Sequence, residues 1–146
     1  MKKQIFRMTQ QRKIILEELR KVTSHPTAQE IFDIVKNRLP RISLGTVYRN
    51  LDVLTDQNLV LKLPTEGGLG NRFDANVHPH AHIACVYCHR VDDVPGTSLV
   101  ADRAEEKAAE ETSYKVMSHS LEFQGICPEC QARHNVIVPV RQETAV

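Results

Sequence analysis

The sequence has 146 residues, enough for one ordinary domain or two small ones, and its net charge of +1 hides an uneven distribution. Residues 1–63 carry 12 Lys and Arg against 6 Asp and Glu, whereas residues 64–146 carry 7 against 12. A basic half indicates a polyanionic partner and an acidic half indicates cation binding, although chance unevenness explains the charges equally well. The sequence shows neither a secretory signal nor a stretch of membrane-spanning length, so we expect a cytoplasmic protein with no membrane partner.

Three amphipathic helices and a hairpin are predicted in the first half. Thr9, Thr27 and Ser43 each precede an apolar-periodic segment as N-caps, while Pro40 and Asn58 are stop signals for the second and third helices. The predicted elements are helices over residues 9–22, 28–39 and 44–57 and strands over residues 59–63 and 71–74. This order is that of a winged helix.

The third helix of a winged helix enters the DNA major groove. Thr46 and Tyr48 offer apolar contacts to thymine methyl groups, and Arg49 offers a bidentate hydrogen bond to guanine. The alternative is that Tyr48 lies at the rim of the core and Arg49 is a solvated charge. The candidate DNA contacts are Arg12, Ser43, Thr46, Tyr48 and Arg49.

The second half mixes strands with a helix. We expect a strand over residues 90–94, a charged helix over 99–111 and a long strand over 114–126. Residues 136–138 are expected to add an edge strand. Alternation along the long strand predicts four buried side chains: Val116, Leu121, Phe123 and Ile126.

All four cysteines occur as two Cys-x-x-Cys pairs, and 38 residues separate the pairs. Four thiolates match the tetrahedral coordination of Zn²⁺, and a closed four-sulfur site is structural because it leaves no open position. Free or redox-active thiols are the alternative. The expected zinc ligands are Cys85, Cys88, Cys127 and Cys130.

The histidines just before the first pair need a different metal or none. His80 and His82 lie on one side of an extended segment, and Asp74 and Asp93 are carboxylates nearby in the sequence. This nitrogen and oxygen set suits Fe²⁺, Mn²⁺ or Zn²⁺, and solvated strand histidines are the alternative.

Six motifs in this order resemble the ferric uptake regulator family. They are Thr-x-Gln-Arg at residues 9–12, His-Pro-Thr-Ala at 25–28, Ser-x-x-Thr-Val-Tyr-Arg-Asn-Leu at 43–51, Arg-Phe-Asp at 72–74, His-x-His at 80–82 and both cysteine pairs. The resemblance implies an α+β protein: a winged-helix DNA-binding domain, then an α/β dimerisation domain with the four-cysteine zinc site. It also implies a homodimeric repressor that binds an inverted-repeat DNA operator. The expected ranges are 1–72 for the first domain, 73–79 for the hinge and 80–146 for the second domain.

The same resemblance assigns the metals. It assigns the four cysteines as ligands of a structural zinc ion. It assigns a regulatory Fe²⁺ or Mn²⁺ to five ligands: His25, Asp74, His80, His82 and Asp93. A metal shared between His25 and the strand that carries His80 and His82 would clamp the two halves together. A metal that binds only the closed arrangement shifts the population toward it. Pro79, Ala81 and Val100 stand where a further family metal site would need polar ligands, which argues against that site and leaves His119 unsupported.

Asp93 stands where iron-uptake regulators usually have Glu, a feature that resembles the peroxide-regulator branch. In that branch Fe²⁺ and hydrogen peroxide oxidise a ligand histidine, here His25 or His80, and the repressor releases DNA. The reaction is stoichiometric, so we do not expect an enzyme. Iron-responsive repression without peroxide sensing and Mn- or Zn-responsive repression are the near alternatives. A metallohydrolase and a zinc-ribbon interaction module are alternatives from other classes.

Overall fold

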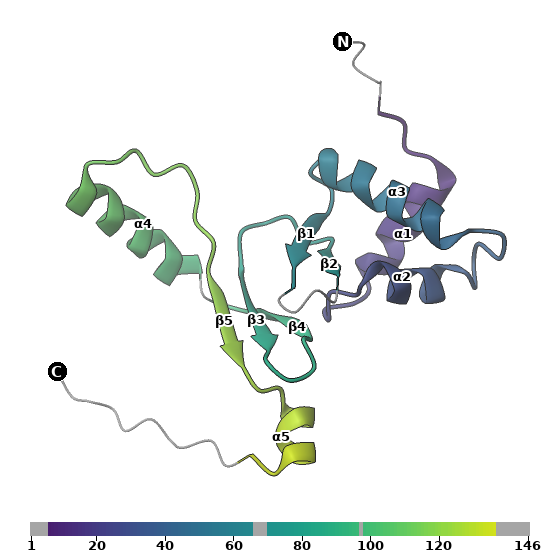
Figure 1. Cartoon of the computed structure of the whole chain (residues 1–146). Coiled ribbons are helices and arrows are strands. Elements are labelled where there is room, and N and C mark those ends of the chain that lie inside the picture. The colour runs from purple at the N-terminus through teal and green to yellow at the C-terminus, as the bar shows by residue number, and fades with distance from the viewer. Residues whose placement is uncertain (1–5, 66–69, 97, 137–146) are drawn as a thin grey trace.

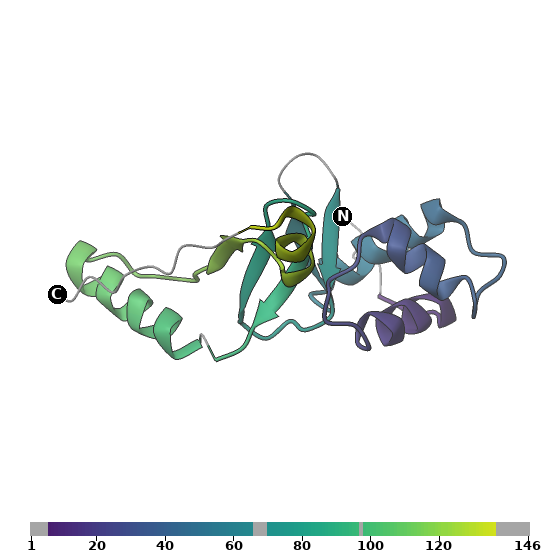
Figure 2. The same cartoon turned by 90° about the horizontal axis from the view of Figure 1, so that it is seen from below.

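The structure is a computed structural model that describes residues 6–65, 70–96 and 98–136. The N-terminal part comprises α1 (Gln10–Leu19), α2 (Ala28–Val35), α3 (Leu44–Asp56), β1 (Leu61–Pro64) and β2 (Asn71–Asp74). The C-terminal part comprises β3 (Ala81–Cys85), β4 (Val91–Val94), α4 (Ser98–Thr112), β5 (Glu122–Gly125) and α5 (Pro128–His134). The molecule is elongated, with the three helices of the winged helix at one end, the strands in the middle and α4 at the other end (Figures 1 and 2).

Side-chain caps start each helix of the winged helix where the sequence predicts them. Thr9 accepts a hydrogen bond from the N–H of Arg12, and Ser43 accepts one from Thr46. Thr27 and Glu30 form both halves of a capping box at α2. Such caps satisfy N–H groups that have no partner within the helix, and each contributes about 1 kcal/mol.

A Schellman motif ends α3 and turns the chain into the hairpin. Asn58 has a left-handed φ of 54°, and the N–H of Leu59 bonds to the carbonyl of Leu54 at 2.9 Å. Strands β1 and β2 then pair antiparallel, with Leu61 opposite Asp74. This pairing places Asp74 beside the base of the helices.

The principal apolar core lies between the three helices and β2. Its buried members are Ile14, Ile15, Leu16, Leu19, Ala28, Ile31, Val35, Ile42, Val47, Leu51, Leu54, Val60 and Phe73. Burying one Leu, Ile or Phe side chain contributes roughly 1.5–3 kcal/mol, so this half has enough core to hold its helices together. The apolar stripes of the three predicted helices are confirmed.

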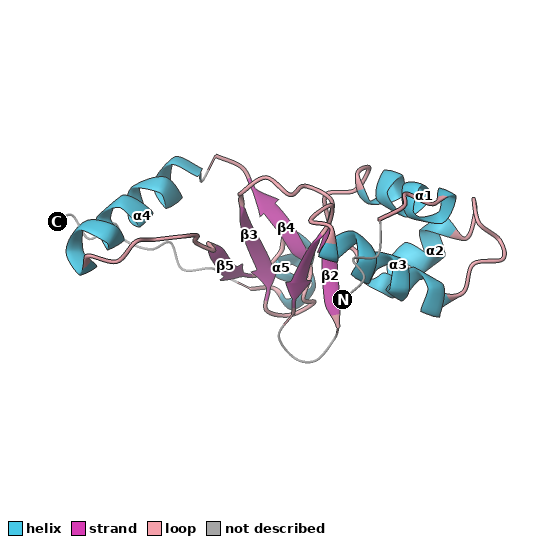
Figure 3. Cartoon of the chain, turned by 90° about the horizontal axis from the view of Figure 1, so that it is seen from above, coloured by secondary structure: helices cyan, strands magenta, loops and turns pink. Residues whose placement is uncertain are grey.

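The C-terminal sheet has the order β4-β3-β5, with β3 antiparallel to β4 and parallel to β5 (Figure 3). The C-terminal half has few buried apolar side chains among the described residues: Ala81, Cys85, Val91, Ala101 and Cys130. Two of these five are thiols. Apolar burial within one chain is therefore a weak source of stability for this half.

Two sequence predictions for the C-terminal half are wrong in part. Only residues 122–125 of the expected strand over 114–126 form a strand, and residues 113–121 belong to no strand, although the carbonyl of Leu121 accepts a hydrogen bond from the N–H of His82 in β3. Phe123 is 40% exposed, and Val116, Leu121 and Ile126 are only partly buried. The helix α5 was not predicted, and residues 137–138 of the expected edge strand lie outside the described residues.

No helix among the described residues combines the length and the apolar character needed to cross a membrane.

Candidate metal centres

Five ionisable side chains meet between the winged helix and the C-terminal sheet. Each offers one nitrogen or oxygen ligand atom, and these atoms all lie within 4.8 Å of one another. The group, called here the regulatory cluster, consists of His25, Asp74, His80, His82 and Asp93. Its members are those that the sequence motifs assign to the regulatory metal.

Strand register brings the regulatory cluster together. His82 in β3 pairs directly with Asp93 in β4, and His80 lies two residues earlier on the same side of the chain. Asp74 ends β2 of the winged helix. His25 lies between α1 and α2, in a loop held to β2 by a hydrogen bond from the N–H of Phe73 to the carbonyl of Pro26.

Short distances link the two halves within the cluster. The Nε2 atom of His25 lies 2.6 Å from Oδ1 of Asp93, and Nε2 of His80 lies 2.8 Å from the same oxygen. The Oδ2 atom of Asp74 lies 3.0 Å from His80 Nε2 and 3.4 Å from His82 Nε2. His25 and Asp74 are 2% and 4% exposed, so the cluster is withdrawn from water on the winged-helix side.

Neighbouring groups orient the His80 ring and shift the pKa values of two members of the cluster. The Nδ1 atom of His80 lies 2.6 Å from the carbonyl of His78, which leaves Nε2 directed toward the carboxylates. Burial lowers the pKa of His80, but the bond to His78 and the charges of Asp93 and Asp74 outweigh it, so the pKa is raised. Burial raises the pKa of Asp74, but hydrogen bonds from His82 and Asn76 outweigh it, so that pKa is lowered.

Three imidazoles and two carboxylates form a donor set that fits a divalent cation. Oxygen and nitrogen ligands of this kind suit Fe²⁺, Mn²⁺ and Zn²⁺. Burial of a carboxylate and imidazoles in one place is costly unless the charges are matched, and a cation at the centre would match them. The ligands come from both halves, so a bound cation would join them.

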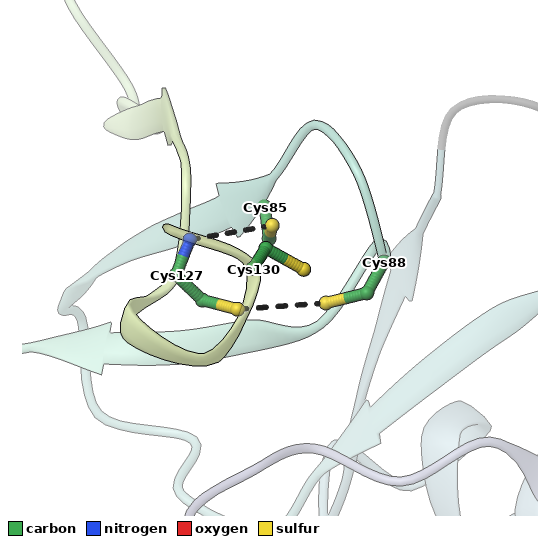
Figure 4. A group of neighbouring side chains, drawn as sticks. All are labelled: Cys85, Cys88, Cys127 and Cys130. Atoms are coloured by element: carbon green, nitrogen blue, oxygen red, sulfur yellow. Dashed lines mark hydrogen bonds between the residues drawn. The ribbon is translucent and has the colours of Figure 1, made fainter. Parts of the chain in front are cut away.

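The four cysteines form a second group at the far end of β3. Cys85 ends β3, Cys88 follows in the next turn, Cys127 is the N-cap of α5 and Cys130 lies within α5 (Figure 4). The Sγ atoms of Cys88 and Cys127 are 3.7 Å apart, too far for a disulfide but close to the ~3.8 Å that Zn–S bonds of about 2.3 Å give in a tetrahedron. The cysteine group fits Zn²⁺ with all four positions filled.

Backbone N–H groups prepare one of these thiols for a metal. Burial raises the pKa of Cys85, but N–H groups of Cys127, Cys88 and Tyr87 outweigh it and lower the pKa to about 6. The N–H of Cys127 lies 3.3 Å from the Cys85 sulfur (Figure 4). Burial and the three other thiols raise the pKa of Cys130 to about 12. Zinc binding must therefore release protons from this group at neutral pH.

Four of the five residues that the sequence assigns to DNA lie at the N-terminal end of α3, and the fifth, Arg12, lies in α1. Tyr48 is 49% exposed. Arg49 donates to the hydroxyl of Thr46, which also lies 2.8 Å from the hydroxyl of Ser43. Arg12 instead bonds to the carbonyl of Arg7 at 2.6 Å. The N-terminal turn of α3 therefore presents hydroxyl, phenol and guanidinium groups together.

The chain is similar to known proteins in both sequence and fold. Residues 3–124 match the Ferric uptake regulator family. The chain belongs to the ferric uptake regulator family. It is 39% identical over 129 residues to the "Peroxide-responsive repressor PerR" of Staphylococcus epidermidis, covering 88% of this chain and 84% of that protein. It is also 39% identical to the "Peroxide operon regulator" of Bacillus subtilis over 88% of this chain and 87% of that protein.

A solved structure of the family supports the fold. The Campylobacter jejuni peroxide stress regulator superposes with a TM-score of 0.71 at 26% identity, covering 82% of this chain and 88% of that one. The α+β fold class expected from the sequence is thereby confirmed, with an N-terminal winged helix and a C-terminal domain that carries the four-cysteine group.

The structure also decides between neighbouring residues that fit the family motifs equally well. Asp92 is bonded to Arg90 at 2.8 Å, so its neighbour Asp93 is the carboxylate in the regulatory cluster. His78 is exposed and contributes its carbonyl rather than its ring. That carbonyl is a contact that sequence reasoning missed, since no side-chain motif signals it.

His119 lines the same cavity as His80 and His82 but is a member of neither ligand group. Its Nδ1 is 2.5 Å from a carboxylate oxygen of Glu105 in α4. Within the described part of the chain, no third group of three or more such ligands gathers around it.

Proposed function

We propose that the chain is a homodimeric, metal-dependent transcriptional repressor that binds an inverted-repeat DNA operator and senses hydrogen peroxide. The observation that carries this proposal is the regulatory cluster, whose ligands come from both halves of the chain. We assign Zn²⁺ to the cysteine group and Fe²⁺ or Mn²⁺ to the regulatory cluster. The boundary expected at residue 72 falls inside β2 (Asn71–Asp74), so we propose that the DNA-binding domain extends through Asp74, the hinge covers 75–79 and the dimerisation domain covers 80–146.

The regulatory metal acts as a reversible clamp. His25 of the winged helix contacts Asp93 of the sheet, and Asp74 contacts His82, so a bound metal would hold the winged helix against the sheet. A cation that binds only this closed arrangement shifts the population toward it. If the cation favours the closed arrangement over the open one by ~3 kcal/mol of binding free energy, operator affinity changes by roughly two orders of magnitude. In a dimer, closure sets the separation of the two recognition helices, which is the distance between operator half-sites.

Oxidation of a ligand histidine removes the regulatory metal and thereby frees the winged helix from the C-terminal sheet. Fe²⁺ held by the regulatory cluster would supply the redox chemistry that activates hydrogen peroxide. His25 or His80 gains one oxygen atom while the peroxide is reduced to one water, so the change is a two-electron oxidation that happens once per site. A cavity of about 430 Å³ lined by residues of β1 and the sheet reaches His80 and His82, and it is wide enough to admit peroxide. The reaction consumes its own ligand, so it is sensing rather than enzymatic turnover.

Exposed apolar side chains on the C-terminal half support the homodimer. Val100 on α4 is 64% exposed, while Tyr114 and Met117 in the segment after α4 are 77% and 82% exposed. Strand β5 is at the edge of its sheet, and α4 stands away from the rest of the chain (Figures 1 and 2). A second copy would cover these surfaces and supply the core that one chain lacks.

Peptide mass spectrometry tests the sensing step. The zinc-loaded protein is filled with Fe²⁺ or Mn²⁺ without oxygen, treated with hydrogen peroxide and digested, and operator binding is measured in parallel. We expect one added oxygen on the peptide with His25 or His80, and loss of operator binding, in the iron form only. Metal-dependent operator binding without an added oxygen would instead support the second candidate, an iron-responsive or a Mn- or Zn-responsive repressor. That candidate is favoured by the donor set alone, which suits all three cations.

A further inference from the structure

Arg72 in β2 bonds to three segments of the chain at once. Its Nε donates to the carbonyl of His89 at 2.9 Å, and its Nη1 donates to the carbonyl of His25 at 3.0 Å. The same Nη1 lies 3.3 Å from a carboxylate oxygen of Glu30. The side chain is only 13% exposed. A planar guanidinium with this many partners is held in one orientation.

The two carbonyls belong to different domains and to different metal centres. His25 is a ligand in the regulatory cluster, whereas His89 directly follows Cys88 of the cysteine group. The N–H of His89 bonds to the carbonyl of Cys85 at 2.9 Å, and the N–H of Cys85 bonds to the carbonyl of Arg90 at 2.8 Å. The His89 carbonyl is therefore fixed relative to the loop that carries the zinc ligands.

His25 and His89 also share an uncommon backbone conformation. Their φ angles are 43° and 58°, in the left-handed region that side chains other than glycine seldom adopt. Interactions elsewhere must hold such residues in place. In both cases Arg72 holds the carbonyl of the left-handed residue.

Strand β2 presents the regulatory ligand and this guanidinium on the same side. Arg72 and Asp74 are two residues apart, so their side chains leave the same face of the strand. Backbone contacts already bind the His25 loop to β2, including a bridge between Thr27 and Arg72. Those contacts stay within the winged helix, whereas the bond from Arg72 to His89 crosses to the other domain.

We propose that Arg72 is a positioning residue that couples the two metal centres. It fixes the His25 loop to the loop of the zinc site and thereby pre-organises the regulatory cluster for its metal. The inference rests on the proposed metal-dependent function. Without Arg72 every ligand remains, but metal binding must then also order the His25 loop, which reduces the affinity. Outer groups that orient ligands typically change metal affinity 10–100-fold.

Three variants separate this role from a general loss of stability. Arg72→Gln removes the guanidinium. Arg72→Lys keeps the charge but replaces a planar fork with a single ammonium group, which cannot reproduce both bonds in the same geometry. Glu30→Gln is the matched control, because it removes the ion pair with Arg72 but leaves the two carbonyl bonds, and a Gln side chain still completes the capping box with Thr27.

The experiment measures Mn²⁺ affinity by electron paramagnetic resonance on the full zinc-loaded chain, with zinc content by elemental analysis. We expect Arg72→Gln and Arg72→Lys to weaken Mn²⁺ binding roughly 10–100-fold at unchanged zinc content, and Glu30→Gln to stay within about threefold. Amide hydrogen exchange of the Mn²⁺-free protein is the second readout. Exchange in the peptides that contain His25 and His89 should speed up in both Arg72 variants, with the α1 and α3 peptides unchanged.

Unchanged Mn²⁺ affinity and unchanged local exchange in Arg72→Gln would overturn the coupling. Faster exchange throughout the chain would overturn it as well, since Arg72 would then be a general stabilising residue. Failure of the unaltered protein to bind Mn²⁺ would overturn the proposed function. Amide hydrogen exchange in the metal-free protein would still show whether Arg72 couples the His25 loop to the loop of the zinc site.

Discussion

The two metal centres differ in how far apart their ligands lie in the fold. The cysteine group is built from two neighbouring strand ends of one domain, since Cys85 closes β3 and Cys127 follows β5, its parallel neighbour. The regulatory cluster is built from both domains, because His25 and Asp74 come from the winged helix. A metal held within one domain contributes to the folding of that domain. A metal held between two domains instead changes the population of the arrangement in which the domains are held together. We therefore expect the cysteine group to hold its metal permanently and the regulatory cluster to bind its metal reversibly.

The largest effect is expected from Cys127→Ser. Structural zinc sites supply apparent folding free energies of ~10–16 kcal/mol, comparable to or greater than the stability of a whole domain. We therefore expect loss of zinc and unfolding of the C-terminal sheet, while the winged helix keeps its helices. Native mass spectrometry and circular dichroism measure the two effects. Val86→Ser in the same loop is the control, because Val86 is 52% exposed and carries no ligand atom. A zinc-free but fully folded variant would contradict the structural role.

His82→Ala should remove the regulatory metal and leave the zinc site intact, the reverse of Cys127→Ser. Loss of one nitrogen donor from the regulatory cluster is expected to weaken Mn²⁺ binding at least ~100-fold, beyond the effect of an outer orienting group, with zinc retained. Metal-dependent operator binding should be lost with it. Titration calorimetry with Mn²⁺ and a gel-shift assay check the result. His78→Ala serves as the control because its ring is exposed and its carbonyl survives the change. Equal Mn²⁺ affinity in both variants would mean that the cluster is not the metal site.

A change in the DNA-reading helix should leave both metals in place. Arg49→Ala is expected to lower operator affinity by about 1–3 kcal/mol, or roughly 5–150-fold, because a bidentate contact to guanine is lost. Fluorescence anisotropy on Mn²⁺-loaded protein measures the change. Arg133→Ala in α5 removes the same charge far from α3 and should bind DNA as before. Equal losses in both variants would indicate a charge effect without base recognition.

The smallest effect is expected from pH, and its sign differs with and without metal. The raised pKa of His80 means that its protonated form stabilises the metal-free fold. That contribution is complete below the ordinary His pKa and is lost as pH rises through the raised value. Metal binding needs the neutral ring, so Mn²⁺ affinity should instead fall as pH drops through the same value. Urea unfolding of the metal-free protein measures the stability, and calorimetry measures the Mn²⁺ affinity. Both are followed between pH 5.5 and 8, a range that includes the ordinary His pKa of ~6.5. Stability and affinity that change in the same direction would contradict it.

Local signals in the sequence were sufficient for the winged helix and for the cysteine group. Caps such as Thr27 and stop signals such as Asn58 act over a few residues, so their effect is visible in a short window. Two matched Cys-x-x-Cys pairs carry their chemistry in their spacing. His25 could be assigned only through resemblance to a family, because its partners His80 and Asp93 are distant in sequence and the contact depends on how the domains meet.

The wrong predictions also have physical causes. Alternation from Tyr114 to Ile126 is typical of a strand, but a strand needs a neighbour, and within one chain β5 finds one only at residues 122–125. The helix α5 carries the signals of a short helix, with Pro128 at its first turn and Asn135 left-handed at its end. In the sequence these signals coincide with the ligand motif formed by Cys127 and Cys130, and the segment is too short to show helical periodicity.

The parallel pairing of β3 with β5 has a consequence for the order of events during synthesis. The winged helix is complete once β2 has left the ribosome, because its core residues all precede Asp74. The sensing domain must wait for β5 and Cys127, which come near the end of the described chain. If the chain functions as we propose, a nascent chain, or one made when zinc is scarce, would acquire its DNA-binding half before the half that regulates it. Zinc supply would then determine how many newly made molecules can respond to the signal at all.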